Sequence, residues 1–347
     1  MKTVKYVFFF LLIVVVVGAV YLATLKGDFD VNRSRVISAD PEVVFNDLND
    51  YKNWKDWGPW YEKDSTLIAI YTGNTVGVGG SYSWTSEQDG DGSMSTLKAE
   101  SPESLDQEIV FKTPFGDMKS EVYWRLEKVD EGTNVTWGMR GTISFFFRYM
   151  TEDMEKDLGD MQDRGLELLD ASIQKKIKIF SLTNQGVVDY SGGFYLYTTT
   201  STKISEMNTK FPKMLAETGE FLRSNNIRTS GSPFTLYHKY DEENGTTMFS
   251  VCYPIPERII TPKGSGILTG FIDRGSYFKS TLKGSYENSN KAWEKAMIEV
   301  EELLDYSMLE DGEPFEVYVN DILTTANPAD LITEIYIPVK KVYPMEQ

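Results

Sequence analysis

The sequence predicts an α+β protein with an N-terminal transmembrane helix and two soluble domains, each built from antiparallel strands and helices. Three patterns lead to this fold class: an uncharged apolar run, a series of strand-like alternations that ends in an amphipathic helix, and a strand pattern that occurs twice. The chain has 347 residues, more than one hydrophobic core usually supports. We expect an anchor over residues 1–29, a first domain over 30–176, a linker over 177–188 and a second domain over 189–347.

The composition excludes several classes of function. The chain has 35 Lys and Arg against 52 Asp and Glu, a formal charge of -17 that repels phosphate backbones, so we expect no nucleic-acid binding. Cys252 and His238 are the only residues of their types, too few for a disulfide or a zinc site, so we expect no metal and no cofactor. His238 has no nucleophile elbow around it, and we interpret it as a strand or core residue.

The apolar run covers residues 6–25, YVFFFLLIVVVVGAVYLATL. At about 1.5 Å per residue this length spans a hydrocarbon layer of about 30 Å. A cleaved signal peptide is the competing interpretation, because a basic start precedes the run and Ala19 and Ala23 resemble a cleavage site. The run is longer than a usual signal core, which favours a permanent single-pass anchor.

The charges on either side of the run predict its orientation. Lys2 and Lys5 precede it, and Lys26, Asp28 and Asp30 follow it. By the positive-inside rule the N-terminus faces the cytoplasm and the soluble domains face the periplasm or the exterior.

The first domain begins with the strand-like segment VNRSRVI, followed by a short helix that Asp40 caps and Pro41 starts. Six alternating segments separated by turns then predict an antiparallel meander. These segments are LIAIYTG, GGSYSWTS, SMSTLKAES, SLDQEIVFKT, MKSEVYWRLEKV and VTWGMRGTI. The stretch TEDMEKDLGDMQDRGLELLDASIQKK has apolar residues at helical spacing and predicts a long closing helix.

This order of elements resembles the START-like, polyketide-cyclase-like (SRPBCC) superfamily with its helix-grip fold. The resemblance is carried by ADPEVVFNDLNDYKNWKDWGPW, with its clustered tryptophans, and by VGVGGSYSW. It implies a cavity between the sheet and the long helix for lipid-like or other apolar molecules. The residues expected to line it are Trp84, Phe111, Trp124 and Trp137. For each of them, packing in the core is the more frequent role of such a side chain.

The second domain contains an internal repeat. GSPFTLYHKY at residues 231–240 matches GEPFEVYVND at 312–321, and VCYPI at 251–255 matches IYIPV at 335–339. A helical stretch precedes each pair, so each half is predicted to be a strand-helix-strand-strand unit.

Two such halves resemble the gyrase-inhibitor-like fold, which is also the effector-binding domain of AraC-type regulators. The matching pieces are PFTLYH, KGSYENSNKAWEKAMIEVEELL, EPFEVYVND and TEIYIPV. The resemblance implies an aromatic, acidic pocket between the halves for apolar, often cationic molecules. Period-two alternation places Glu334 with Tyr336, and Glu316 with Tyr318, each pair on one face of its strand. Glu334 is the strongest single candidate for the pocket carboxylate, and Tyr237 and Trp293 complete the expected ligand-binding set.

Three functions remain open. The leading interpretation is a membrane-anchored, non-catalytic binding protein for hydrophobic or cationic small molecules, with protein partners unknown. The first alternative is a hydrolase of electrophilic toxins in which Glu334 is the general base and Tyr336 orients it. The second is an envelope scaffold or stress protein whose pockets are vestigial.

Overall fold

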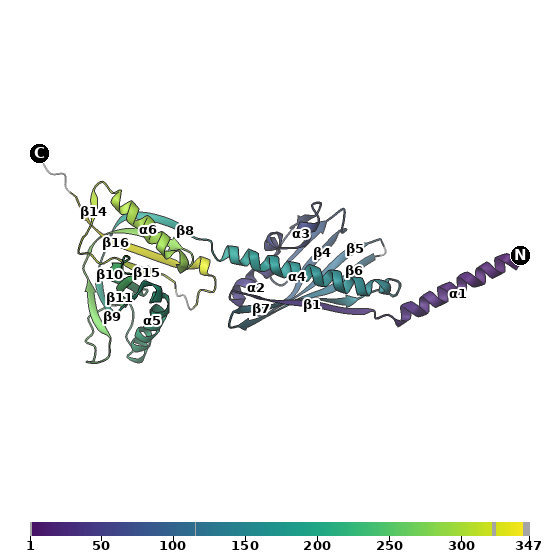
Figure 1. Cartoon of the computed structure of the whole chain (residues 1–347), viewed down its shortest axis with the longest axis horizontal. Coiled ribbons are helices and arrows are strands. Elements are labelled where there is room, and N and C mark those ends of the chain that lie inside the picture. Colours follow the sequence, from purple (N-terminus) through teal and green to yellow (C-terminus); the bar gives the residue numbers. More distant parts are fainter. Residues whose placement is uncertain (1, 115, 321–323, 343–347) are drawn as a thin grey trace. The chain divides into compact units, whose positions relative to one another are not determined.

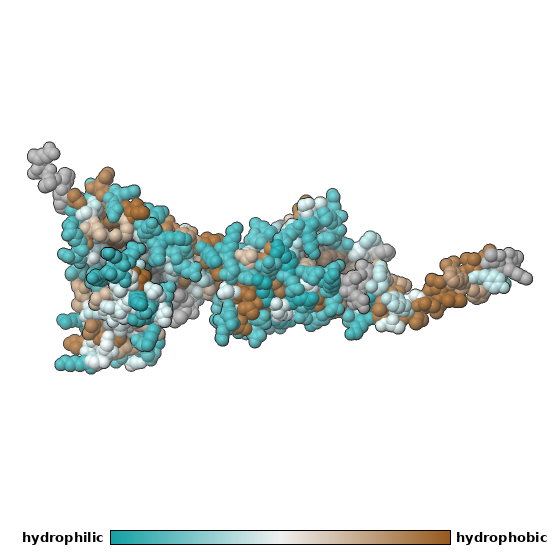
Figure 2. Space-filling view, viewed as in Figure 1, coloured by the Kyte–Doolittle hydropathy of each residue, from teal (hydrophilic) through white to brown (hydrophobic). Residues whose placement is uncertain are grey.

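The computed structural model describes residues 2–114, 116–320 and 324–342, and the chain divides into two units, residues 1–176 and 177–347. The first unit begins with helix α1, Lys2–Thr24. Its segment Val4–Thr24 reaches a hydropathy of 2.8 and is long and apolar enough to cross a membrane, a test that a signal sequence also passes. Figure 2 shows the hydrophobic residues gathered along this helix. The prediction of an N-terminal apolar helix is therefore confirmed.

Seven strands of the first unit form one antiparallel sheet in the order β1-β7-β6-β5-β4-β3-β2. Strands β2 to β7 are the predicted meander, and β1 joins it by pairing with β7 from Asp28↔Thr142 to Ile37↔Thr133. The strands are β1 (Asp28–Ile37), β2 (Ile68–Ile70), β3 (Ser81–Thr85), β4 (Gly92–Glu100), β5 (Ser104–Thr113), β6 (Gly116–Val129) and β7 (Gly132–Thr142).

Helices cover one face of this sheet (Figure 1). The short helix α2, Pro41–Asn49, begins as predicted, with the Asp40 carboxylate accepting a hydrogen bond from the backbone N–H of Glu42 at 3.1 Å. One turn, α3 (Trp60–Lys63), follows it, and the long helix α4, Thr151–Lys176, closes the unit. Its buried residues Leu166, Leu169 and Ile173 face the sheet. The predicted helix-grip arrangement is confirmed.

The second unit contains a larger antiparallel sheet in the order β12-β9-β11-β10-β15-β16-β13-β8, with β14 paired to β16. Its strands are β8 (Ser181–Tyr190), β9 (Gly193–Lys203), β10 (Phe234–Asp241), β11 (Thr246–Ile255), β12 (Leu268–Ile272), β13 (Gly275–Lys283), β14 (Tyr306–Met308), β15 (Phe315–Tyr318) and β16 (Ile332–Lys341). The two copies of the sequence repeat, β10 and β15, meet at the centre, which gives the sheet an approximate twofold symmetry. Residues 181–188, within the expected linker, belong to the edge strand β8.

Both long helices of this unit pack on the same face of the sheet, which we call the helix face (Figure 1). Helix α5, Met207–Ser224, packs against Phe249 and Val251, and helix α6, Ser289–Glu301, packs against Ile335 and Ile337. The opposite face, which we call the open face, carries its own apolar cluster. That cluster comprises Tyr195, Phe234, Leu236, Cys252, Tyr277, Phe315 and Tyr336.

Candidate ligand-binding site

The two central strands of the second sheet bring a buried carboxylate and a ring of aromatic donors together. Thr235 of β10 lies opposite Glu316 of β15 in the antiparallel register. Two hydroxyls donate to one oxygen of Glu316: Tyr237 at 2.9 Å and Tyr318 at 2.7 Å, both to Oε1. The Trp293 indole N–H donates to the other oxygen, Oε2, at 2.8 Å. Three aromatic residues therefore fix both oxygens of one carboxylate.

Each helix of the second unit contributes an aromatic ring to this site. Trp293 comes from α6 and makes an edge contact with Tyr237 at 5.4 Å between ring centroids. Phe211 comes from α5 and lies 4.9 Å from the Tyr318 ring, which also contacts Tyr286 at 5.5 Å. The site therefore lies on the helix face between α5 and α6, where the two halves of the repeat meet.

The electrostatics of the site are unbalanced. Glu316 is only 6% exposed, and among the described residues no lysine, arginine or histidine forms an ion pair with it. Burial, together with the nearby Glu316 carboxylate, raises the pKa of Tyr237 and Tyr318 well above the usual value, so both hydroxyls keep their protons and act as donors. A carboxylate removed from water without a cation is costly, and neutral hydrogen bonds offset only part of that cost.

The approximate symmetry explains how the site is built. In the repeat, Thr235 corresponds to Glu316 and Tyr237 corresponds to Tyr318. The contacts follow the same symmetry, because Tyr237 bonds to Glu316 and Tyr318 lies 2.7 Å from the Thr235 hydroxyl. The duplicated surface therefore carries an acid in one half only. The alignment of PFTLY with PFEVY contains this asymmetry, and sequence reasoning placed it instead at Glu334.

A buried hydroxyl lies beside the same site. Thr333 of β16 pairs with Tyr318 in the register, so both side chains lie on the helix face. Thr333 is 1% exposed, and its Oγ1 has no hydrogen-bond partner among the described residues. It was not predicted, since an isolated Thr in a strand has no distinctive pattern.

Glu334, the strongest candidate from the sequence, lies on the opposite face of the sheet from Glu316. Residues that pair across an antiparallel ladder share a face, and Glu334 pairs with Val317 while Glu316 pairs with Ile335. Glu334 forms an ion pair with Lys279 at 2.9 Å and accepts a hydrogen bond from Tyr336 at 2.8 Å. The predicted pairs are thus each on one face, but the structure does not bring Glu334 and Tyr336 to the Glu316 site.

The single histidine forms a chain of polar contacts on the open face. His238 Nε2 lies 2.6 Å from the Ser250 hydroxyl, and its Nδ1 lies 2.6 Å from a Glu313 carboxylate oxygen. This order of groups resembles a hydrolytic triad, yet Ser250 is completely buried in the middle of β11 and also contacts the Thr199 hydroxyl at 2.6 Å. A nucleophile must reach its substrate, so these contacts indicate a structural network.

The four aromatic residues predicted to line a cavity in the first domain lie in a packed aromatic cluster. Trp124 and Trp137 stack at 4.7 Å between ring centroids, and both contact Trp57 from the segment after α2. Trp84 contacts Phe111 at 5.8 Å. Trp84, Trp124 and Trp137 are buried. Their contacts with one another are those of core residues, and their role in ligand binding stays a prediction.

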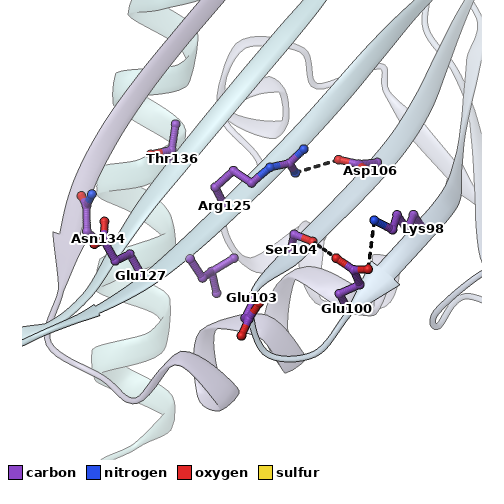
Figure 3. A pocket seen from close by; sticks show the side chains of 10 residues that line it. Lys98, Glu100, Glu103, Ser104, Asp106, Arg125, Glu127, Asn134 and Thr136 are labelled. Atoms are coloured by element: carbon purple, nitrogen blue, oxygen red, sulfur yellow. Dashed lines mark hydrogen bonds and ion pairs between the residues drawn. The ribbon is translucent and has the colours of Figure 1, made fainter.

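A polar pocket of about 370 Å³ lies on the other face of the same sheet (Figure 3). Four of its charged side chains form ion pairs with one another: Arg125 with Asp106 at 2.7 Å and Lys98 with Glu100 at 2.9 Å. Its lining residues are Lys98, Glu100, Glu103, Ser104, Asp106, Arg125, Leu126, Glu127, Asn134 and Thr136.

In the described part of the chain, His, Cys, Asp and Glu residues form no group of three suited to a metal ion.

Comparison with known proteins assigns both domains. Residues 28–174 match the family described as polyketide cyclase / dehydrase and lipid transport. Residues 193–339 match the family described as integron-associated effector binding protein. The chain joins a polyketide cyclase-like domain to an effector-binding domain. Both families predicted from the sequence are therefore confirmed, and both point to small-molecule ligands.

Several solved structures are similar to the chain at low identity. The EcmrR C-terminal domain is 18% identical with a TM-score of 0.39, covering 47% of this chain and 99% of its own. EcmrR in a complex with DNA is 18% identical with a TM-score of 0.41, covering 56% and 70%. Protein CV1439 from Chromobacterium violaceum is 16% identical with a TM-score of 0.33, covering 42% and 97%. No curated protein matches the chain significantly.

Proposed function

We propose that the effector-binding domain binds small organic cations at Glu316. The observation that carries this proposal is a buried carboxylate held by three neutral aromatic donors without an ion-pair partner among the described residues. A cationic ligand would supply the missing charge. The faces of Tyr237, Trp293 and Tyr318 would add cation–π attraction, which is strongest where water is excluded.

The tested change is Glu316→Gln, which removes the charge and keeps the size of the side chain. We expect the affinity for a lipophilic cation, such as a tetraphenylphosphonium salt, to fall about tenfold or more, since one lost charge contact of about 1.4 kcal/mol has that effect. Quenching of tryptophan fluorescence or calorimetry measures it. Glu334→Gln is the matched control, because Lys279 already neutralises that carboxylate on the open face. Equal losses in both variants, or none in Glu316→Gln, would contradict the proposal.

The proposed role is non-catalytic. The hydrolase alternative requires Glu334 as a general base, but its two oxygens are engaged by Lys279 and Tyr336. The scaffold alternative requires a site without a ligand, and it predicts that no variant of Glu316 alters the binding of any cation. The same titrations therefore separate the binding and scaffold interpretations.

We further propose that α1 is retained as a single-pass anchor with its N-terminus in the cytoplasm. The length and hydropathy of residues 4–24 and the basic residues Lys2 and Lys5 support this topology. The full chain should float with lipid vesicles, while a chain that begins at residue 28 should stay in the aqueous fraction. In this arrangement the binding domain would meet ligands outside the cytoplasm.

A further inference from the structure

The first domain is tied closely to the end of the apolar helix. Helix α1 ends at Thr24 and strand β1 begins at Asp28. Four Cα–Cα steps join Thr24 to Asp28, so these residues lie at most about 14 Å apart. If α1 crosses a bilayer, as proposed above, the beginning of β1 must therefore lie at the bilayer surface. Any other side chain that is exposed at this end of the sheet must then also lie at the bilayer surface.

An aromatic turn occupies that end of the sheet. Asp28 pairs with Thr142, and the Ile143 backbone N–H donates to the Gly27 carbonyl at 2.7 Å, so the chain leaving β7 runs beside the start of β1. The next residues form the 3-10 turn Phe145–Met150, with the sequence FFFRYM. Arg148 in this turn donates to the Leu25 carbonyl at 3.4 Å. The aromatic turn is thus bonded to the segment that follows the apolar helix.

Two aromatic side chains of this turn are unusually exposed for their type. Phe146 is 74% exposed and Tyr149 is 59% exposed. Met118 of β6 is 45% exposed and belongs to the same end, because Ser120 pairs with Gly141 and Met118 lies two residues further in that direction. Exposing such large apolar groups to water is costly, and a cluster of them marks an interaction surface.

Lipid is the partner that fits this surface. Aromatic residues are enriched where a membrane protein passes from hydrocarbon to water, since their rings are apolar and their edges tolerate polar headgroups. Arg148 lies over the Phe145 ring at 5.4 Å and so places a positive charge within the aromatic turn. Cationic side chains at this level attract lipid phosphates.

We propose that Phe146 and Tyr149, with Met118, form an interfacial anchor that inserts into the headgroup region of the bilayer spanned by α1. The anchor holds the first domain against the membrane surface and fixes which end of its sheet faces the lipid. This inference rests on the proposed retention of α1, and it adds a second, independent contact with the same bilayer.

The test places an environment-sensitive fluorophore at single cysteines in the full chain, reconstituted in vesicles of phosphatidylethanolamine and phosphatidylglycerol. Cys252 is completely buried and is replaced in the background variant Cys252→Ser. The emission of labels at Phe146→Cys and Tyr149→Cys should shift to the blue and become severalfold brighter than the emission of the same label in water. The matched control is Val36→Cys, because Val36 is 47% exposed but lies at the opposite end of β1. Its label should report water.

A further label at Val14→Cys, within α1, separates the two proposals. A hydrocarbon signal at Val14 with aqueous signals at Phe146 and Tyr149 would overturn the interfacial anchor and leave the membrane helix intact. An aqueous signal at Val14 would overturn both. The labelled positions are exposed on the surface, so the substitutions should leave the melting temperature unchanged. Equal melting temperatures of the variants then show that the comparison concerns folded protein.

Discussion

Glu316 and Glu334 are chemically identical, and each lies two residues before a tyrosine on the same strand face, yet their surroundings give them different roles. Glu334 has Lys279 at 2.9 Å, whereas Glu316 has three neutral donors and almost no contact with water. The period of the strands predicted both pairs. It could not predict which pair faces the helices, because that depends on the side from which α5 and α6 pack.

Thr333 provides a test of the polarity of the Glu316 site. Its buried hydroxyl lacks a hydrogen-bond partner among the described residues, and valine has a similar size but no hydroxyl. Thr333→Val should therefore increase the free energy of unfolding of the ligand-free protein by about 1 kcal/mol. Chemical denaturation measures the change. The reverse result, a loss of stability, would mean that this hydroxyl is bonded in the folded protein.

Asp47 provides a test of pH dependence in the first domain. Burial raises the pKa of Asp47 above the usual value of 3.8, although Lys176, at 2.5 Å, acts in the opposite direction. A carboxyl with a raised pKa favours the folded state below its usual pKa, and this contribution is lost as the pH rises through the raised value. The wild type should therefore lose stability relative to Asp47→Asn as the pH rises from about 4 to about 7. Denaturation at both pH values measures it, and a relative gain would show that the pair with Lys176 dominates.

At the scale of elements, helix α4 shows what amphipathic spacing can and cannot predict. The spacing predicted a long helix with an apolar face, and the structure confirms it. Spacing could not predict why Gly165 occupies that face. Gly165 lies where a Cβ atom would be 2.5 Å from the Trp137 ring and 3.2 Å from Pro59, so the helix approaches the aromatic cluster more closely than any other residue would allow.

We therefore expect Gly165→Ala to destabilise the first domain by about 1 to 3 kcal/mol, because overpacking outweighs the gain in helix propensity. Gly159→Ala in the same helix is the matched control. There the new methyl group meets only the end of the flexible, partly exposed Arg33 side chain, so stability should stay the same or increase by up to about 1 kcal/mol. Thermal denaturation of both variants makes the comparison, and equal effects would contradict the close packing against Trp137.

At the scale of the whole molecule, the chain consists of two units whose cores are separate. The tryptophan cluster of the first domain draws all its rings from residues 54–137, and the described apolar clusters of the second domain draw theirs from residues 182–339. The acidic composition still predicts that the chain does not bind nucleic acid.

Separate cores predict separate folding. Fragments 28–176 and 177–347 should each be folded when expressed alone, with melting temperatures within a few degrees of the two transitions of fragment 28–347. Circular dichroism and calorimetry test this. A fragment that is unfolded alone, but folded when joined to the other, would show that the domains stabilise each other.

The amino-acid sequence was sufficient to predict the apolar helix, the meander of the first domain and the duplicated strands of the second, because hydrophobic periodicity, turn residues and an internal repeat are local patterns. The strands β8, β12 and β14 lie outside the predicted repeat units. The sequence also contained the asymmetry between Thr235 and Glu316. The three-dimensional arrangement was needed to show which carboxylate is buried without an ion-pair partner among the described residues, and which aromatic residues of the first domain pack against one another. Those outcomes depend on which face of a sheet a helix covers and on which distant side chain reaches a charge, and neither is encoded in the spacing of neighbouring residues.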